Sequence, residues 1–549
     1  MMREDPRRQA WARLKAAGPW DLVVIGGGAT GLGVALDAAA RGLSVALFEA
    51  KDFASGTSSR ATKLVHGGVR YLAQGHLGLV HEALRERALM LAHAPHLAQR
   101  LEFVVPTFRL WEGPYYGAGL KAYDALAWGK RLGPTEFLSP AATRRALPTV
   151  QPAGLCGGVS YWDGQFDDAR MAVLLARTAA ARGALVFNHA PVVALHRQSH
   201  TGRPDALTHL GGLTVRDALG TESVHVAARC IVNATGVWVD ALRDLDRADE
   251  GSPPAARAPM VKASQGVHLV VDRAFLPGSR ALMVPRTRDG RVLFAVPWMG
   301  KTILGTTDTP RDDIVREPEA LASEVDFVLS EMAGYLQPAP RRADVRSVWV
   351  GLRPLVQPQG VDAGRSTASM SREHTVVVDP SGLVTVTGGK WTTYRAMAQD
   401  VLKHCMTHGL LPSRPAGPAA GHALLGAQVA DVKGAPSLAD PPGLHLYGSE
   451  APVVQALPGA HRWLAYDAET GQGILSEAMV RFAVRYEMAR EVEDVLARRC
   501  RLLFLDAHQA AEVASDVAAI LKDEIGEAWD AEASVASFQA LAAQYARVP

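Results

Sequence analysis

The chain has 549 residues, 48% of them hydrophobic, which is enough for two or three packed domains rather than one core. Its 58 Lys and Arg balance 56 Asp and Glu, so the overall charge gives no reason to expect a nucleic-acid partner. Any anionic ligand must therefore be held by a local cluster of cations. The first 20 residues lack the apolar core of a secretory signal, and no stretch approaches the roughly 18 apolar residues of a membrane span.

Residues 21–33 read DLVVIGGGATGLG, a short apolar run followed by glycines. The run predicts a strand, the glycines a tight turn, and the alanine-rich stretch after them a helix. Gly26 permits the turn, Gly28 lets the backbone approach a pyrophosphate, and Gly31 lets the helix pack close to the strand. A second strand, SVALFE, ends in Glu49, which is placed to accept hydrogen bonds from an adenosine ribose. This order predicts a dinucleotide site without separating NAD from FAD.

A polar loop follows at residues 56–72, with the sequence GTSSRATKLVHGGVRYL. A simple nicotinamide-binding unit would be expected to continue directly into its next helix and strand. Here the hydroxyl groups of Thr57, Ser58 and Ser59 are available to bind a pyrophosphate or a ribityl chain. A solvated serine loop without a ligand is the competing interpretation.

Two later stretches indicate returns to the same nucleotide-binding domain. Residues 228–242 (ARCIVNATGVWVDAL) predict a buried strand that breaks at Thr235-Gly236, and residues 383–402 (LVTVTGGKWTTYRAMAQDVL) predict a strand, a turn and a helix. The turn at Gly388 and Gly389 places a helix N-terminus where it can face a developing anion, such as the N1–C2=O edge of a reduced flavin. A domain that returns so late in the chain must be discontinuous, with another domain inserted in it.

Seven motifs occur in the order found in one family: VVIGGGATGLG, TSSRATKLVHGGVRYL, NATGVWVD, ILGTTDT, VGLRPL, SREHTVVVD and GGKWTTYR. Through them, from about Asp21 to Leu402, the chain closely resembles the FAD-dependent glycerol-3-phosphate dehydrogenases of the quinone-linked respiratory type. The resemblance implies an α/β fold with a two-dinucleotide-binding-domain, Rossmann-like FAD core. It also implies an inserted substrate domain with a mixed or antiparallel sheet, and an α-helical C-terminal cap domain.

The sequence accommodates this division. Alternating runs such as QGVHLVVD and VLFAVPW suit an antiparallel sheet, the stretch after Leu402 is rich in Pro, Gly and Ala, and a strongly helical pattern begins at Ser476. We expect the FAD-binding domain at 19–99, 156–254 and 351–404, the substrate domain at 100–155 and 255–350, and a linker and helical C-terminal domain at 405–549.

The resemblance implies oxidation of sn-glycerol 3-phosphate to dihydroxyacetone phosphate, with hydride passing to N5 of FAD. This reaction needs a phosphate clamp, a base for the C2 hydroxyl and charge stabilisation on the substrate oxygen. Arginine suits the clamp because its planar fork donates two parallel hydrogen bonds, while lysine adds a point charge. The family's substrate cations match Arg70, Arg353, Arg372 and Lys390, with Tyr71 and Thr393 as neutral donors.

Two histidines lie in matched motifs, His268 in GVHLVV and His66 in VHGG, and imidazole titrates in the right range for a base. We favour His268 as the base near C2 and Arg353 as the group that polarises the C2 oxygen or helps hold the phosphate. His66 is a flavin contact and the second catalytic candidate. A hydrogen-bonded, inert histidine is the competing interpretation for either residue. Tyr123 and Trp298 are candidates to line the pocket or to belong to the core.

The implied FAD contacts extend over the whole nucleotide-binding domain. They are Gly26, Gly28, Gly31, Glu49, Thr57, Ser58, Ser59, Lys63, His66, Gly67, Gly68, Val193, Gly236, Trp238, Gly388, Gly389, Lys390, Trp391 and Thr392. No metal is expected, because the four cysteines, Cys156, Cys230, Cys405 and Cys500, lack the spacing of a zinc or iron–sulfur site. This usage is typical of a reducing compartment.

The resemblance covers two kinds of enzyme with different electron acceptors. The dehydrogenases reduce a membrane quinone, ubiquinone or menaquinone, whereas similar oxidases reduce oxygen and release hydrogen peroxide. We expect the quinone, with the protein cytoplasmic and peripheral on the cytoplasmic face of the inner (plasma) membrane. The basic segments RRQAWARLK and MVRFAVRYEMAR either contact anionic lipid or pack on the protein itself. A homodimer is one option for the assembly, and a flavin-bearing module without turnover is a third functional hypothesis.

Overall fold

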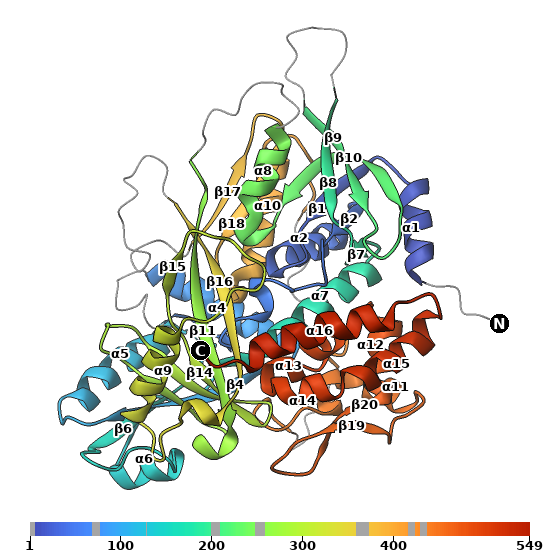
Figure 1. The fold of residues 1–549 in the computed structure, drawn as a ribbon. Helices are drawn as coiled ribbons and strands as arrows, with labels where there is room; N and C mark the ends of the chain where they lie inside the picture. Colours follow the sequence, from blue (N-terminus) through green and yellow to red (C-terminus); the bar gives the residue numbers. More distant parts are fainter. Residues whose placement is uncertain are drawn as a thin grey trace.

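The computed structural model describes residues 6–68, 77–127, 129–198, 209–247, 258–357, 373–415, 423–428 and 436–549. In these ranges the chain forms an eight-stranded sheet, a ten-stranded sheet, a two-stranded sheet and a helical C-terminal region (Figure 1). Both large sheets combine strands that are far apart in the sequence, so the two domains that they define are discontinuous.

The first sheet is centred on strand β1 (Trp20–Ile25), whose apolar, β-branched residues suit a strand covered on both faces. The strand order is β17-β18-β10-β1-β2-β7, and all neighbours are parallel except β17 and β18. A β8–β9 hairpin extends from β10. The other bounds are β2 (Val45–Phe48), β7 (Leu185–Phe187), β8 (Val192–Gln198), β9 (His209–Arg216), β10 (Ser223–Asn233), β17 (His374–Val378) and β18 (Leu383–Gly388).

Helices cover both faces of this sheet. On one face α2 (Ala29–Ala40) packs against both α7 (Asp168–Ala181) and α10 (Tyr394–Thr407). On the other face Trp11 and Leu14 of α1 (Pro6–Ala16) and Leu242 of α8 (Val239–Arg247) join the sheet's second apolar cluster.

The second sheet is mixed and lies beside the first (Figure 1). Its order is β15-β11-β14-β13-β12-β4-β6-β3, with β16 on β11 and β5 on β6, and only β4 and β12 pair in parallel. The bounds are β3 (Leu64–Val65), β4 (Ala98–Thr107), β5 (Glu136–Leu138), β6 (Gly157–Phe166), β11 (Val261–Asp272), β12 (Ala281–Val284), β13 (Leu293–Trp298), β14 (Lys301–Gly305), β15 (Thr309–Arg311) and β16 (Val345–Val356). Its helices are α4 (Leu77–His93), α5 (Glu112–Leu126), α6 (Pro140–Ala146) and α9 (Ala322–Ala333).

The C-terminal region is mainly helical, and α13 and α16 pack against β16 of the second sheet. Its elements are α11 (Ala451–Gln455), β19 (Trp463–Tyr466), β20 (Gly473–Ser476), α12 (Glu477–Glu487), a π-helical turn at Asp494–Arg499, α13 (Leu502–Leu505), α14 (Ala507–Glu512), α15 (Ala514–Ile525) and α16 (Ala531–Ala546). These helices lie against both large domains (Figure 1), so the C-terminal region is well placed to influence either one.

The strands depart from the expected domain boundaries in two places. Strand β6 belongs to the second sheet, although the sequence alone places residues from 156 onward in the FAD-binding domain. Strand β16 runs through the expected boundary at residue 351. Both strands leave the second sheet only when their ladders with β4 and β11 end. We propose the same division of the chain into domains, with β6 and β16 assigned to the substrate domain.

The two basic segments considered for lipid contact pack on the protein. Trp11 and Leu14 of α1 are buried, and α12 buries most of its apolar side chains. Within the described ranges, no helix combines the length and the apolar character needed to cross a bilayer. All four cysteines are free thiols.

Candidate active site

One cavity of about 1430 Å³ is lined by residues of both large sheets. This volume exceeds the roughly 300–1,000 Å³ of sites for drug-sized ligands. At one end it is lined by the glycine turn after β1, and elsewhere by His268 and Arg353 of the second sheet. The cavity is therefore large enough for a dinucleotide together with a small substrate.

The glycine turn needs glycine at two positions. Gly26 has φ +114°, and a Cβ there would lie 2.5 Å from the carbonyl oxygen of Ala234. A Cβ on Gly31 would overlap the carbonyl oxygen of Gly26, so only glycine lets α2 approach the strand this closely. Gly28 precedes the first turn of α2 and lines the cavity. The helix N-terminus thus opens onto the cavity, where its free N–H groups and dipole favour a phosphate.

Glu49 follows β2 at the carboxyl edge of the sheet and lines the cavity. Its Oε2 accepts a hydrogen bond from the Gly27 N–H at 2.7 Å, and its Oε1 accepts one from the Lys51 N–H at 2.9 Å. These bonds orient the carboxylate next to the glycine turn, as expected for a group that binds a ribose.

The polar loop lies along the cavity wall rather than in solvent. Thr57 and Ser58 line the cavity, and Ser58 Oγ accepts a hydrogen bond from the Ala29 N–H at 3.0 Å. The indole N–H of Trp391 donates to the Ser58 carbonyl at 2.8 Å, which joins the loop to the turn after β18. The cavity is also lined by His66, Gly68, Gly236, Trp238, Gly388, Gly389, Lys390, Trp391, Thr392 and Thr393. The return of the chain predicted at residues 383–402 therefore lies at the same cavity as the first turn.

His268 lies on β11 and is almost completely buried, with its ring stacked on Trp349 at 5.2 Å between ring centres. Its Nε2 lies 2.9 Å from Thr62 Oγ1, while its Nδ1 is buried without a hydrogen-bond partner. A Cβ on Gly305 of the neighbouring strand would lie 2.5 Å from the ring, so that glycine makes room for the imidazole. Burial lowers the pKa of His268 well below its usual range, and the charges of Lys63 and Arg353 lower it further.

Arg353 lies on β16 beside β11, opposite Ser264, and its side chain is 23% exposed. Its guanidinium donates to the Thr307 carbonyl at 2.9 Å and to Thr306 Oγ1 at 3.2 Å. A Cβ on Gly266 would overlap this guanidinium, so a glycine again provides the space. It also forms an ion pair with Asp308 at 3.4 Å. Because these acceptors orient the guanidinium and Arg353 lines the cavity, it can bind an anion there.

Five of the expected FAD contacts do not line the cavity: Gly31, Ser59, Lys63, Gly67 and Val193. Gly31 acts through packing, and the N–H of Gly67 donates to the Tyr123 hydroxyl at 2.7 Å. The Val193 side chain is 41% exposed, and its neighbour Val192 lines the cavity instead, because successive residues of a strand point to opposite faces.

Lys63 is fully buried behind the polar loop, and Ser59 is almost completely buried beside it. The lysine Nζ donates to the Ser59 carbonyl at 2.6 Å and to Asp168 Oδ2 at 2.8 Å. Burial is the largest cause that lowers the pKa of Lys63 to about 7, although Asp168 opposes the shift. Lys63 therefore supports the wall of the cavity from behind.

Several cavity residues were missed as individual candidates. Thr306, Thr307 and Asp308 line the cavity and belong to the motif ILGTTDT, which is the signal that points to them. Asp163 also lines it, and no local pattern marks that residue. The Asp163 carboxylate accepts hydrogen bonds from Arg87 and from Tyr123. Tyr123 and Trp298, the two aromatic candidates for the pocket, are buried core residues that do not line the cavity. Arg70, Tyr71 and Arg372, expected at the substrate phosphate, lie outside the described residues.

The polar groups and glycine turns that line the cavity fit FAD. The glycine turn, Glu49 and the α2 N-terminus suit an adenosine diphosphate, and the second turn at Gly388 and Gly389 lies elsewhere on the same cavity. The unpartnered Nδ1 of His268 is a buried polar group of the kind that a ligand satisfies.

Comparison with known proteins also indicates an FAD-binding protein. Residues 21–395 match the family model described as FAD dependent oxidoreductase, and residues 441–534 match the C-terminal domain of alpha-glycerophosphate oxidase. The chain is therefore an FAD-dependent oxidoreductase, and FAD is its cofactor.

Relatives define the branch of this class. A mitochondrial glycerol-3-phosphate dehydrogenase of Arabidopsis thaliana is 39% identical over 94% of this chain and 84% of its own length, and that of Homo sapiens is 37% identical over 96% and 73%. The glycerol-3-phosphate dehydrogenase of Bacillus halodurans, solved with FAD, superposes with a TM-score of 0.74 at 27% identity, covering 99% of this chain and 98% of its own. The chain belongs to the FAD-dependent glycerol-3-phosphate dehydrogenase family. The resemblance, the fold class and the cofactor predicted from the sequence are confirmed.

Proposed function

We propose that this protein oxidises sn-glycerol 3-phosphate to dihydroxyacetone phosphate. The observation that carries the proposal is that a buried neutral histidine, His268, and two cations, Arg353 and Lys390, line the same cavity as the FAD-binding turn. A base for a hydroxyl and positive charge for a phosphate are the two things this oxidation requires of the protein. The names of the relatives point to the same substrate.

In this proposal the side chains of the cavity have separate roles in the oxidation. FAD, when bound, supplies the hydride acceptor at N5. His268 accepts the proton of the C2 hydroxyl as C2 becomes a carbonyl carbon, and its lowered pKa keeps it unprotonated at neutral pH. Arg353 polarises the C2 oxygen or holds the phosphate, and Lys390 adds positive charge. Thr393 also lines the cavity and is a neutral donor. From the sequence resemblance we include Arg70, Tyr71 and Arg372 in the proposed clamp.

We further propose that the electrons pass to a membrane quinone, with the protein held on the cytoplasmic face of the inner membrane. An exposed apolar patch around α5 supports this acceptor: Leu110, Trp111, Tyr115 and Phe137 expose between 54% and 86% of their surface. Four exposed cations lie close in sequence to the patch, namely Arg109, Lys121, Lys130 and Arg131. An apolar surface accompanied by basic residues suits the interface of an anionic bilayer.

The patch is one helix away from the cavity. Helix α4 lines the cavity with Leu79, Glu82 and Ala83, and it packs on α5 through Val80 and Leu84. A quinone dissolved in the bilayer would thus approach the cavity from the side of the patch. The position of the patch supports quinone as the acceptor.

Anaerobic stopped-flow spectroscopy tests both proposals in one experiment. Glycerol 3-phosphate should bleach the flavin, and a soluble quinone should reoxidise it faster than air does. Rapid reoxidation by air with one peroxide per flavin would instead identify an oxidase, as the name of the matching C-terminal family suggests. A flavin that glycerol 3-phosphate does not bleach would rule out the substrate and favour a module without turnover.

A further inference from the structure

The segment Asp52–Ser59, here called the flavin loop, forms the wall of the cavity beside the glycine turn. Its residues Ala54 to Ser58 line the cavity. The Ala54 N–H donates to the Gly27 carbonyl at 3.0 Å, and Ser58 Oγ accepts from the Ala29 N–H at 3.0 Å. A displacement of the loop would therefore disturb both the glycine turn and the N-terminus of α2.

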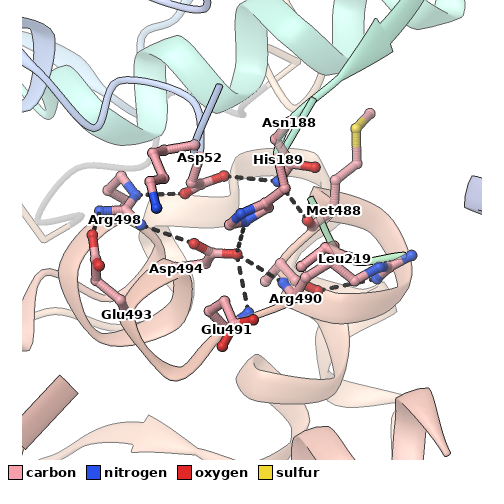
Figure 2. Close-up of polar contacts among 12 residues, drawn as sticks. Asp52, Asn188, His189, Leu219, Met488, Arg490, Glu491, Glu493, Asp494 and Arg498 are labelled. Atoms are coloured by element: carbon pink, nitrogen blue, oxygen red, sulfur yellow. Dashed lines mark hydrogen bonds and ion pairs between the residues drawn. The ribbon is translucent and has the colours of Figure 1, made fainter. Parts of the chain in front are cut away.

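Both ends of the flavin loop are held from behind by one segment of the C-terminal region. At the first end Asp52 is fully buried, and Arg499 binds both of its oxygens, at 2.6 and 3.0 Å. The Nε of Arg498 donates to the same carboxylate at 2.5 Å (Figure 2). At the other end the Ser59 carbonyl accepts a hydrogen bond from Arg501 at 2.8 Å.

The arginines are fixed by a network of their own. Asp494, at the start of the π-helical turn, accepts hydrogen bonds from Arg498 Nη2 at 2.8 Å and from the backbone N–H of Arg490 at 2.8 Å (Figure 2). It also accepts from the Glu491 N–H at 3.1 Å, and the Nε2 of His189 lies 2.9 Å from Asp494 Oδ2. The spacing of Asp52, His189 and Asp494 would allow them to bind a metal ion, but Arg498 and Arg499 already neutralise both carboxylates. We therefore interpret these five residues as a structural ion-pair cluster, here called the clasp.

The clasp acts at a distance from the cofactor. Of the residues that the structure describes, none beyond Asp400 lines the cavity. The segment 494–501 therefore acts on the cavity indirectly, through the flavin loop and through Asp168, which Arg501 also binds and which accepts a hydrogen bond from the Ala61 N–H. Removing one partner of a buried charge pair leaves the other charge uncompensated, so the loop would have to move or admit water.

We propose that Arg498, Arg499 and Arg501 are positioning residues for FAD. They hold the flavin loop in the conformation that binds the cofactor, so FAD binding and docking of segment 494–501 stabilise each other. By linkage, whatever loosens the docked segment weakens FAD binding, and FAD in turn tightens the segment. This coupling depends only on FAD as the cofactor and is independent of the substrate and the electron acceptor.

The first test measures FAD release from the purified holoenzyme by the rise of flavin fluorescence after dilution. Arg499→Gln should bind FAD about 5- to 150-fold more weakly, the usual range for coupled sites, and release it correspondingly faster. The matched control is Arg481→Gln, which breaks ion pairs with Glu477 and Glu524 inside the C-terminal region. The control should lower the thermal midpoint while FAD release stays within about twofold of wild type. Equal FAD release in the two variants would overturn the proposal.

The second test needs no variant and decides the matter if Arg499→Gln does not fold. Amide hydrogen exchange of the full-length protein is compared with and without FAD. Segment 494–501 should exchange more slowly with FAD bound, although it makes no contact with the cavity, while helix α15 should be unaffected. Identical exchange of segment 494–501 in the two states would overturn the proposal.

Discussion

His268 combines burial, neutrality and contact with the cavity, which together fit a proton acceptor. Replacing it by Asn should lower kcat by about 10²- to 10⁴-fold with little change in KM, because the base acts in the transition state rather than in binding. The measurement is the anaerobic rate of flavin reduction by glycerol 3-phosphate. Thr62→Val, which removes only the partner of Nε2, is the matched control and should cost far less. A variant with normal kcat and raised KM would make His268 a binding group.

Lys63 provides a second test at the residue scale, through pH. With a pKa of about 7, Lys63 is positively charged at the acidic pH where His268 would take up a proton. Its charge opposes that protonation, so Lys63→Met should raise the pKa of His268. The acid limb of kcat/KM, measured with FAD in excess, should move to higher pH, because activity requires the neutral imidazole. An unmoved acid limb would mean that Lys63 does not influence the base.

At the scale of elements, α5 carries the surface assigned to the membrane. The double variant Leu110→Asp, Trp111→Asp should bind anionic vesicles less and reduce vesicle-borne quinone more slowly, because it places charge on the apolar patch. Cosedimentation with the vesicles measures the first effect. Flavin reduction by glycerol 3-phosphate should be unchanged.

The control for α5 lies in the C-terminal region. Val453 and Tyr466 expose 41% and 49% of their surface without belonging to the patch. Val453→Asp, Tyr466→Asp adds the same charge elsewhere and should bind vesicles like wild type. If both double variants lose binding equally, the effect comes from charge alone and α5 is not the docking surface.

The elements that the sequence predicts well are those coded locally. The strand, turn and helix around Gly26 to Gly31 depend on neighbouring residues, and so does the turn at Gly388 and Gly389. The clasp could not be predicted, because Asp52 and Arg498 are 446 residues apart and no periodicity links them. Val192 rather than Val193 lines the cavity for another reason: a shift of one residue along a strand turns a side chain to the opposite face.

Lys63 illustrates a limit of motif reasoning. Its place inside a matched motif predicts a flavin contact. In the structure its Nζ instead donates to Asp168, 105 residues away in the sequence, on the side of the loop that faces away from the cavity. The motif correctly marks the region of the site, whereas the distant partner decides which face of the wall the side chain occupies.

At the scale of the whole molecule, the clasp joins three parts of the chain. Arg7 of α1 donates to the His189 carbonyl at 3.3 Å and to Asp217 at 2.7 Å, while the ring of His189 meets Asp494 in the C-terminal region. Although burial lowers the pKa of His189, Asp494 and Asp52 outweigh it and raise the pKa above its usual range. The pKa of Asp494 is held below its usual range, chiefly by His189 against the effect of burial.

These shifts predict how stability depends on pH. A histidine whose folded pKa is raised stabilises the folded state fully below about pH 6.5, its unfolded pKa, and loses this effect as pH rises through the folded pKa. His189→Gln should therefore destabilise the protein more at pH 6 than at pH 9. Urea midpoints of wild type and variant at the two pH values measure the difference. A pH-independent difference would show that His189 contributes by packing rather than by charge.

The separation of the flavin loop from its arginines has a consequence for biosynthesis. Asp52 leaves the ribosome 446 residues before Arg498, so the glycine turn and the loop emerge long before the groups that hold them in place. On a growing chain the first nucleotide-binding elements can form, but the carboxylate of Asp52 stays in water until Arg498 and Arg499 are made. If the arginines position the loop as proposed, we expect stable binding of FAD only after the C-terminal region has folded against the nucleotide-binding domain.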